Sequence, residues 1–142
     1  MDPFTGKRFT LSATGAPAFS PDSRWLLLCG TEENALFETG TWRERARWAS
    51  SGDDYLRRCV AFSSDSKRLA ISSGNESLKI FTVPEMREVI TLTPPRPLDL
   101  RRVVFSPDGR KLWAMGAAAR IFEWDLDALE RELQTLGIPW EQ

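Results

Sequence analysis

The sequence contains no histidine, which removes both the commonest general base and the commonest metal ligand of proteins. It holds only two cysteines, Cys29 and Cys59, and both lie in apolar segments, so buried thiols explain them better than a disulfide or a metal site. Nucleophile-elbow, phosphate-loop, dinucleotide-binding and zinc-finger motifs are also missing. We therefore expect a protein that is not an enzyme, with no catalytic residue, no cofactor and no metal.

A strong net charge and a long apolar run are missing as well. The 19 Lys and Arg residues nearly balance 20 Asp and Glu residues, so a net charge of −1 gives no general attraction to nucleic acid or to an anionic membrane. No apolar run approaches the roughly 18 to 20 residues of a membrane span, and the N-terminus lacks the apolar centre of a secretory signal. We expect a cytoplasmic protein whose partners are neither nucleic acid nor membrane.

One short motif returns three times at a constant interval of 43 residues. It occupies residues 19–24, 62–67 and 105–110, and each copy carries Phe, Ser and Asp at matching positions. An apolar strand precedes each copy and a second strand follows its Ser/Pro/Asp-rich turn, which predicts a hairpin. A third and a fourth strand complete the longer units. Four short antiparallel strands in such a period are typical of one blade of a β-propeller.

The predicted fold class is therefore all-β, made of four-stranded antiparallel propeller blades with a short C-terminal helix. The repeats are expected over about residues 16–48, 58–92 and 101–126, and they end without a fourth strand in the last copy. A lone strand at 7–11 is expected to complete a neighbouring blade. The three motif phenylalanines, Phe19, Phe62 and Phe105, are expected to be buried between sheets.

The C-terminal segment, residues 127–142, has a different pattern. Its leucines recur at helical intervals, and Asp127 and Glu130 have the spacing of a capping box, which predicts a short amphipathic helix that begins there. We expect this helix to cover the edge of the last blade, with docking onto a foreign partner as the alternative.

These features resemble the WD-repeat family. The likeness is carried by the three motif copies, by the dipeptide Trp124-Asp125, and by residues 2–7, which are similar to the segment that follows the Trp of a WD dipeptide. It covers about residues 2 to 126. No Gly-His pair precedes an inner strand, and the first two units end in Phe37 and Phe81 rather than Trp. The sequence is closer to a divergent bacterial branch, whose repeats often follow a protein-kinase domain.

The resemblance also implies a candidate partner-binding face. In the family, the loops that enter the innermost strand and those that join the second and third strands lie together and commonly bind partners. Eight residues of this chain correspond to such loops: Glu32, Glu33, Asp53, Asp54, Tyr55, Asn75, Glu76 and Arg96. Tyr and Arg are enriched at interface hot spots, but each residue by itself is equally explained by an ordinary solvated loop.

The resemblance implies a non-catalytic scaffold for protein–protein interactions. Propellers usually need at least four blades to close, so we expect a homo-oligomer in which two or three chains form a ring and residues 7–11 of one chain complete the last blade of the next. One alternative is a fragment of a longer propeller attached to a bacterial protein kinase. The others are a periplasmic propeller that shares the turn motif, and an enzymatic propeller, such as a lactonase or hydrolase, with a metal in its central channel.

Overall fold

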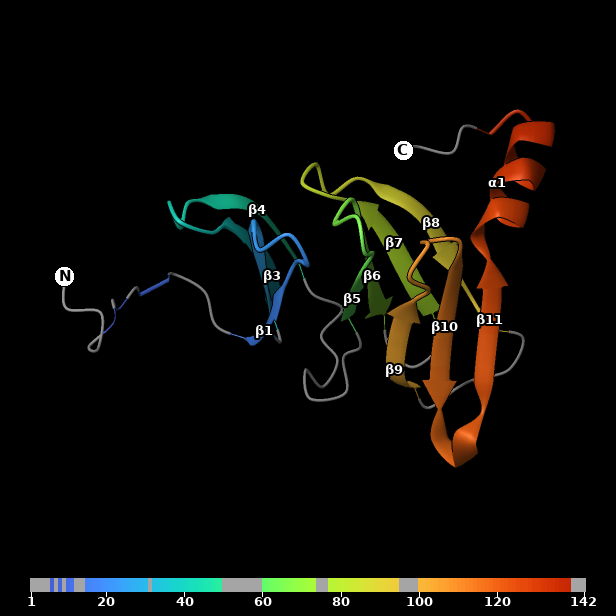
Figure 1. Cartoon of the computed structure of the whole chain (residues 1–142), viewed down its shortest axis with the longest axis horizontal. Coiled ribbons are helices and arrows are strands. Elements are labelled where there is room, and N and C mark those ends of the chain that lie inside the picture. The colour runs from blue at the N-terminus through green and yellow to red at the C-terminus, as the bar shows by residue number, and fades with distance from the viewer. Residues whose placement is uncertain are drawn as a thin grey trace.

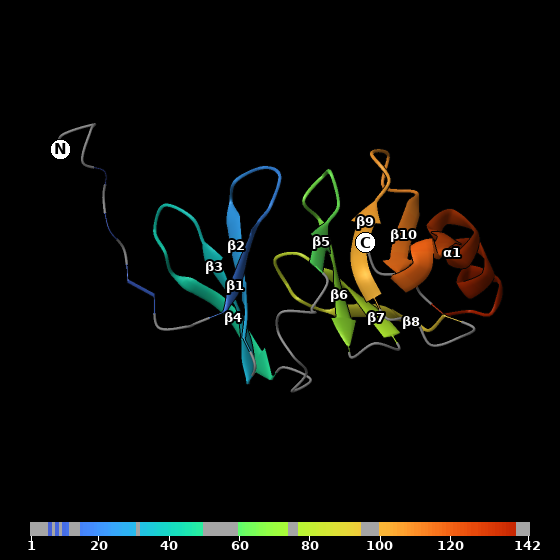
Figure 2. The same ribbon diagram turned by 90° about the horizontal axis from the view of Figure 1, so that it is seen from below.

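Three antiparallel β-sheets follow one another along the chain and stand side by side, as Figure 1 and Figure 2 show from two directions. The computed structural model describes residues 6, 8, 10, 11, 15–30, 32–49, 60–73, 77–94 and 100–138. Within these residues it contains eleven strands and a single α-helix. The all-β class and the C-terminal helix predicted from the sequence are confirmed.

The strands of each sheet are adjacent in chain order, so every sheet is a meander. The first sheet is formed by β1 (Ala16–Phe19), β2 (Trp25–Cys29), β3 (Glu33–Glu38) and β4 (Glu44–Ala49). The second is formed by β5 (Val60–Phe62), β6 (Arg68–Ser73), β7 (Ser77–Thr82) and β8 (Glu88–Leu92). The third is formed by β9 (Leu100–Phe105), β10 (Lys111–Gly116) and β11 (Ile121–Asp125). A 3-10 turn, η2 (Ala117–Ala119), joins β10 to β11, and α1 (Leu126–Thr135) follows.

The repeated motif forms the turn between the first two strands of each sheet. In the first copy the Ser20 hydroxyl donates to a carboxylate oxygen of Asp22 at 2.6 Å and accepts from the backbone N–H of Trp25 at 3.0 Å. The same Asp22 oxygen accepts from the backbone N–H of Arg24 at 3.0 Å. The second and third copies repeat this network. The Ser and Asp of the motif therefore recur because they hold the hairpin turn.

Two further hydrogen bonds join the turns of neighbouring sheets. The backbone N–H of Asp22 donates to the hydroxyl of Ser66 at 3.0 Å, which connects the first turn to the second. The hydroxyl of Ser64 donates to the carbonyl of Pro107 at 2.6 Å, which connects the second turn to the third. The turns thus form a row along one end of the stack.

The core lies between the sheets in two clusters, because successive side chains of a strand point to opposite faces. The cluster between the first and second sheets contains Trp25, Leu27, Cys29, Leu36, Leu69, Ile71 and Val83. The cluster between the second and third sheets contains Ala70, Leu78, Ile80, Leu92, Leu100, Val103, Phe105, Leu112, Ala114 and Leu126. The second sheet contributes side chains to both clusters, so it is packed on both faces.

A third, smaller cluster lies on the other face of the first sheet. It contains Leu26, Leu28, Ala35 and Phe37, and Leu11 and Trp42 pack against it. Among the described residues no sheet stands in front of this face.

The phenylalanines of the motif have three different environments. Phe105 is 6% exposed and belongs to a core cluster, and Phe62 is partly buried against another, but Phe19 is 58% exposed. The prediction that all three are buried is wrong for Phe19, because within the described residues no sheet lies against its face of the first sheet. Of the strand predicted at 7–11, Lys7 and Phe9 lie outside the described residues, so that strand stays a prediction.

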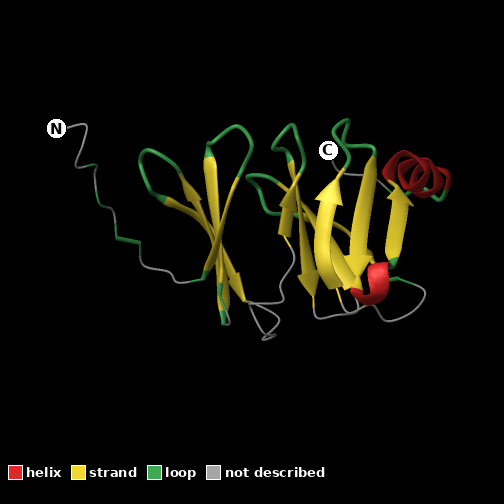
Figure 3. Cartoon of the chain, turned by 60° about the horizontal axis from the view of Figure 1, so that its bottom comes forward, coloured by secondary structure: helices red, strands yellow, loops and turns green. Residues whose placement is uncertain are grey.

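The N-cap of the helix lies two residues earlier than the capping-box spacing predicts. Asp125 is the N-cap, and its carboxylate accepts from the backbone N–H of Ala128 at 3.0 Å, whereas Asp127 lies inside the first turn. Leu126 is buried in the cluster between the second and third sheets, and Leu129 and Leu133 pack against it. Figure 3 shows the helix at the end of β11. The helix thus covers part of the chain's own core, as expected.

Candidate protein-binding surface

Six of the eight candidate residues stay predictions. Asp53, Asp54, Tyr55, Asn75, Glu76 and Arg96 lie outside the described residues. Glu32 and Glu33 are exposed at the start of β3, as expected for a loop that faces solvent.

Glu33 already has a partner within the chain. Its carboxylate forms an ion pair with the guanidinium of Arg47 on β4, and Arg47 also binds Glu44. The two carboxylates, Glu44 more strongly than Glu33, raise the pKa of Arg47 above its usual value. Arg47 therefore belongs to a charged, solvated strand at the edge of the sheet. Of the two candidate residues Glu32 and Glu33, Glu32 is therefore the one whose carboxylate is more available to a partner.

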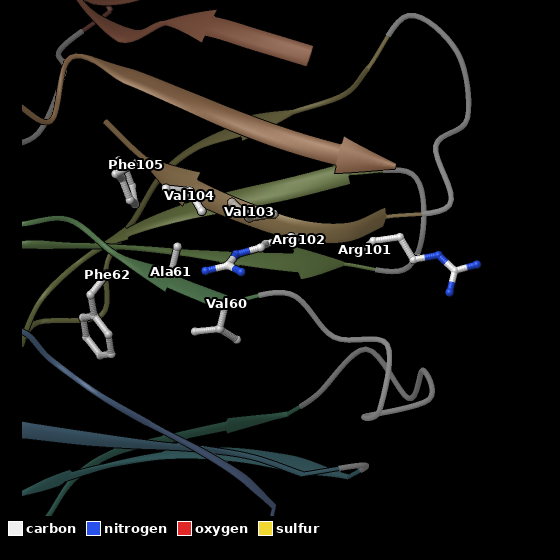
Figure 4. A pocket seen from close by; sticks show the side chains of 8 residues that line it. All are labelled: Val60, Ala61, Phe62, Arg101, Arg102, Val103, Val104 and Phe105. Atoms are coloured by element: carbon white, nitrogen blue, oxygen red, sulfur yellow. The ribbon is translucent and has the colours of Figure 1, made fainter. Parts of the chain in front are cut away.

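A groove runs between the innermost strands of the second and third sheets. It has a volume of about 400 Å³ and is lined by residues 60–62 of β5 and 101–105 of β9 (Figure 4). Figure 4 shows Arg102 extending across Ala61, whereas Arg101 points away from the groove. Each of these strands is at the edge of its sheet in the described topology. Apolar side chains and two arginines thus line the groove, and most of its exposed surface is polar.

A second hollow lies on the outward face of the third sheet, the face that points away from the second sheet. It measures about 400 Å³ and is lined by Arg102, Val104, Trp113, Met115 and Ile121. Met115 is 38% exposed and Ile121 is 62% exposed. We call it the Trp113 hollow.

Lys111 and Glu123 form an ion pair at one side of the Trp113 hollow. The indole Nε1–H of Trp113 donates to Oε1 of Glu123 at 2.8 Å, and the Lys111 ammonium lies 3.4 Å from the same oxygen. The hydrogen bond from Trp113 is the main reason that the pKa of Glu123 is lowered. The indole is therefore fixed in orientation while its ring face remains available for contact.

A third hollow, of about 600 Å³, lies where the motif turns of the second and third sheets meet the loop after β7 and the start of α1. Its lining is polar and of mixed charge, and Arg110 Nε lies 3.6 Å from Asp127 Oδ2 within it. Burial raises the pKa of Asp65 there, but the Ser63 hydroxyl and the Lys67 N–H outweigh burial, and the net effect is a lowered pKa. The carboxylate of Asp65 therefore holds its own motif turn.

The residues that the structure describes contain no group of three or more Cys, Asp or Glu side chains close enough to hold a metal ion. In the same part of the chain, no helix has the length and apolar character needed to cross a membrane.

The Trp113 hollow was not predicted from the sequence. The available signal was the alternation of Lys111, Trp113 and Met115 in β10, which places large side chains on the face opposite to buried Leu112 and Ala114. A strand with large side chains on both faces indicates a sheet with contacts on both sides.

Comparison with protein-family models finds no matching family, and no curated protein matches the chain. A solved structure of U3-55K, a WD40 propeller protein, is similar in fold. Its TM-score is 0.67, with 17% sequence identity. The match covers 86% of this chain but 38% of the chain of U3-55K, so this chain spans well under half of that protein. The arrangement of the sheets is thus WD40-like and agrees with the predicted propeller blades.

Proposed function

We propose that this chain is a non-catalytic scaffold for protein–protein interactions, built from WD-like propeller blades of the divergent bacterial type and acting in the cytoplasm. The observation that carries the proposal is the WD40-like stack of sheets. Its outward surfaces present Trp, Met and Arg, which are enriched in the cores of protein interfaces. Loops between the strands can vary without disturbing the core, so they suit the recognition of a partner.

The partner-binding face comprises the loops around Glu32, Asp53, Tyr55 and Arg96. A partner isolated with the wild-type chain is purified, and its affinity is measured by calorimetry for wild type and for a Glu32→Lys, Asp53→Lys double variant. We expect about tenfold or more weaker binding, because opposed charges at an interface become like charges. Glu85→Lys is the matched control, since Glu85 is exposed in the turn after β7, at the opposite end of the strands. Equal affinities of all three proteins would contradict this face.

We also propose that two or three chains close a ring, with residues 7–11 of one chain completing the last blade of the next. In the described topology β11 pairs on one side only, whereas the corresponding β3 and β7 pair on both. Trp48 of β4 and Ile90 of β8 each pack against the cluster that joins their own sheet to the following sheet. Leu11 packs in a similar way against the cluster on the outer face of the first sheet. This contact of Leu11 supports the proposed role of residues 7–11 as the outer strand of a preceding blade.

The mass of the chain in solution, measured by light scattering, tests the ring. We expect two or three chains per particle for the full chain and loss of the assembly after deletion of residues 1–11. The alternative, a piece of a longer propeller attached to a protein kinase, predicts a full-length chain that stays monomeric at every concentration.

A further inference from the structure

The large apolar side chains that are most exposed gather on the two outward faces of the sheet stack. Among the described residues five such side chains are well exposed, and three of them are Phe19 on the first sheet and Met115 and Ile121 on the third. The other two, Leu136 and Ile138, follow α1. Contiguous exposed apolar residues of this kind mark interaction sites.

The internal repeat shows what the position of Phe19 is suited to contact. Phe62 packs in the cluster that joins the second sheet to the first, and Phe105 in the cluster that joins the third sheet to the second. Each of these rings therefore points toward the preceding sheet. Phe19 holds the same position in the first sheet, where the described chain provides no preceding sheet, and it is 58% exposed.

The repeat also shows which surface receives such a ring. From the first three strands of the second sheet, β5 to β7, four side chains belong to the cluster that holds Phe105 or pack against it: Ala61, Ala70, Leu78 and Ile80. The residues 43 positions later in the third sheet are Val104, Trp113, Ile121 and Glu123. Three of these four line the Trp113 hollow, and Glu123 binds the indole of Trp113. The hollow therefore lies where the third sheet would receive the motif phenylalanine of a following sheet.

The helix leaves this surface open. Leu126, Leu129 and Leu133 pack in the cluster between the second and third sheets, on the other side of the third sheet from the hollow. Ile121 of β11 is 62% exposed even though the helix begins at the end of that strand.

We propose that the outward face of the third sheet binds the outward face of the first sheet of a second copy, with Phe19 of one chain in the Trp113 hollow of the other. This rests on the proposed ring and specifies its main contact. The two faces are different, so the association is head-to-tail and leads to a closed ring or an open chain of copies. Phe19 is the anchor, because aromatic side chains that fill a pocket dominate interface energies.

The experiment uses the full chain and measures mass and dissociation constant by light scattering and sedimentation. Phe19→Asp and Ile121→Asp should each weaken self-association about 30-fold or more, the loss typical of an interface hot spot. Leu136→Asp is the matched control, since Leu136 is 73% exposed and lies outside both faces, and it should assemble like wild type. Circular dichroism should be unchanged, because neither Phe19 nor Ile121 is buried.

A mixture of the two variants gives a sharper test. The Phe19→Asp chain keeps an intact hollow and the Ile121→Asp chain keeps an intact Phe19, so an equimolar mixture should form a complex of two chains although each variant alone is monomeric. A photoreactive benzoylphenylalanine at position 19 should cross-link to Trp113, Met115 or Ile121 of a differently isotope-labelled chain.

The outcomes separate this inference from the ring itself. If Phe19→Asp keeps the wild-type assembly while deletion of residues 1–11 abolishes it, the ring stands and the Phe19 contact is wrong. A wild-type chain that is monomeric at every concentration overturns both. Cross-links from position 19 that stay within one chain, or a mixture that remains monomeric, also overturn the contact.

Discussion

Truncation of the three motif phenylalanines to alanine should destabilise the protein in the order of their burial. A phenylalanine side chain that is fully buried removes about 200 Å² from water, which at about 25 cal/mol/Å² stabilises the fold by about 5 kcal/mol. Phe105 is 6% exposed within a packed cluster, so Phe105→Ala should cost about 3 to 5 kcal/mol, including the cavity that it leaves. Phe62 is partly buried, and its removal should cost about 1 to 3 kcal/mol.

Phe19→Ala should change the free energy of unfolding by less than about 0.5 kcal/mol in the monomer, because its ring is 58% exposed and none of the sheets that the structure describes packs over it. The assay is urea unfolding followed by tryptophan fluorescence, with the free energy extrapolated to water. All variants are made in the Ile121→Asp background, so that self-association does not add to the measured stability. Equal losses at the three positions, or a loss below about 1 kcal/mol for Phe105→Ala, would refute the assignment of the clusters.

Four other outcomes are expected. Ser20→Ala should cost about 1 to 3 kcal/mol, because it leaves a backbone N–H that is buried at the motif turn without its acceptor, and thermal unfolding will measure this. The pKa of Asp22 is lowered mainly by the hydrogen bond that its carboxylate accepts from the Ser20 hydroxyl. The charged carboxylate therefore stabilises the fold fully above the unfolded pKa of about 4, and this contribution is lost as pH falls through the lower folded pKa. In an acid titration the free energy of unfolding should decline less for Asp22→Asn than for wild type. Asp125→Ala should destabilise the chain by about 0.5 to 2 kcal/mol through loss of the helix cap, whereas Asp127→Ala should be nearly neutral in the same thermal assay. Generic ester, phosphate and lactone substrates should not be turned over, and activity that survives repurification but disappears in Arg102→Ala would disprove the non-catalytic assignment.

The repeat was readable from the sequence because its signal is local. The Ser and Asp of each motif bond to backbone groups within five residues, so the same six-residue pattern gives the same turn in every sheet. The strands on both sides follow from that turn and from the alternation of apolar residues. Strand positions therefore depend little on the rest of the molecule.

Burial was not readable in the same way, because it depends on neighbours that lie outside the repeat. Phe19 has the same position in the motif as Phe105, yet Phe19 is 58% exposed and Phe105 is 6% exposed, since among the described residues a sheet covers Phe105 and none covers Phe19. The predicted start of the helix was wrong for a related reason. The spacing of Asp127 and Glu130 is a local signal, whereas the helix begins at Leu126 because this side chain is buried in the core.

The sequence predicted the exposure of the candidate binding residues better than it predicted their interactions. Glu32 and Glu33 are exposed as expected, but the ion pair between Glu33 and Arg47 depends on the register of β3 and β4, which single-residue patterns do not specify. The pattern of β10 places Trp113 and Met115 on one face but does not show whether another sheet covers that face. The hollow that they line exists because none of the sheets that the structure describes covers that side.

The hydrogen bonds between neighbouring turns give the repeats a fixed order. The bond from Asp22 requires a hydroxyl at Ser66, where the third copy has Gly109, and the bond from Ser64 starts at a position where the first copy has Pro21. Each junction therefore uses a polar group that the corresponding residue of another copy does not possess. The copies share one shape, but exchanging the second motif with the third would break both links, so divergence within the motif makes the second sheet specific to its place between the other two.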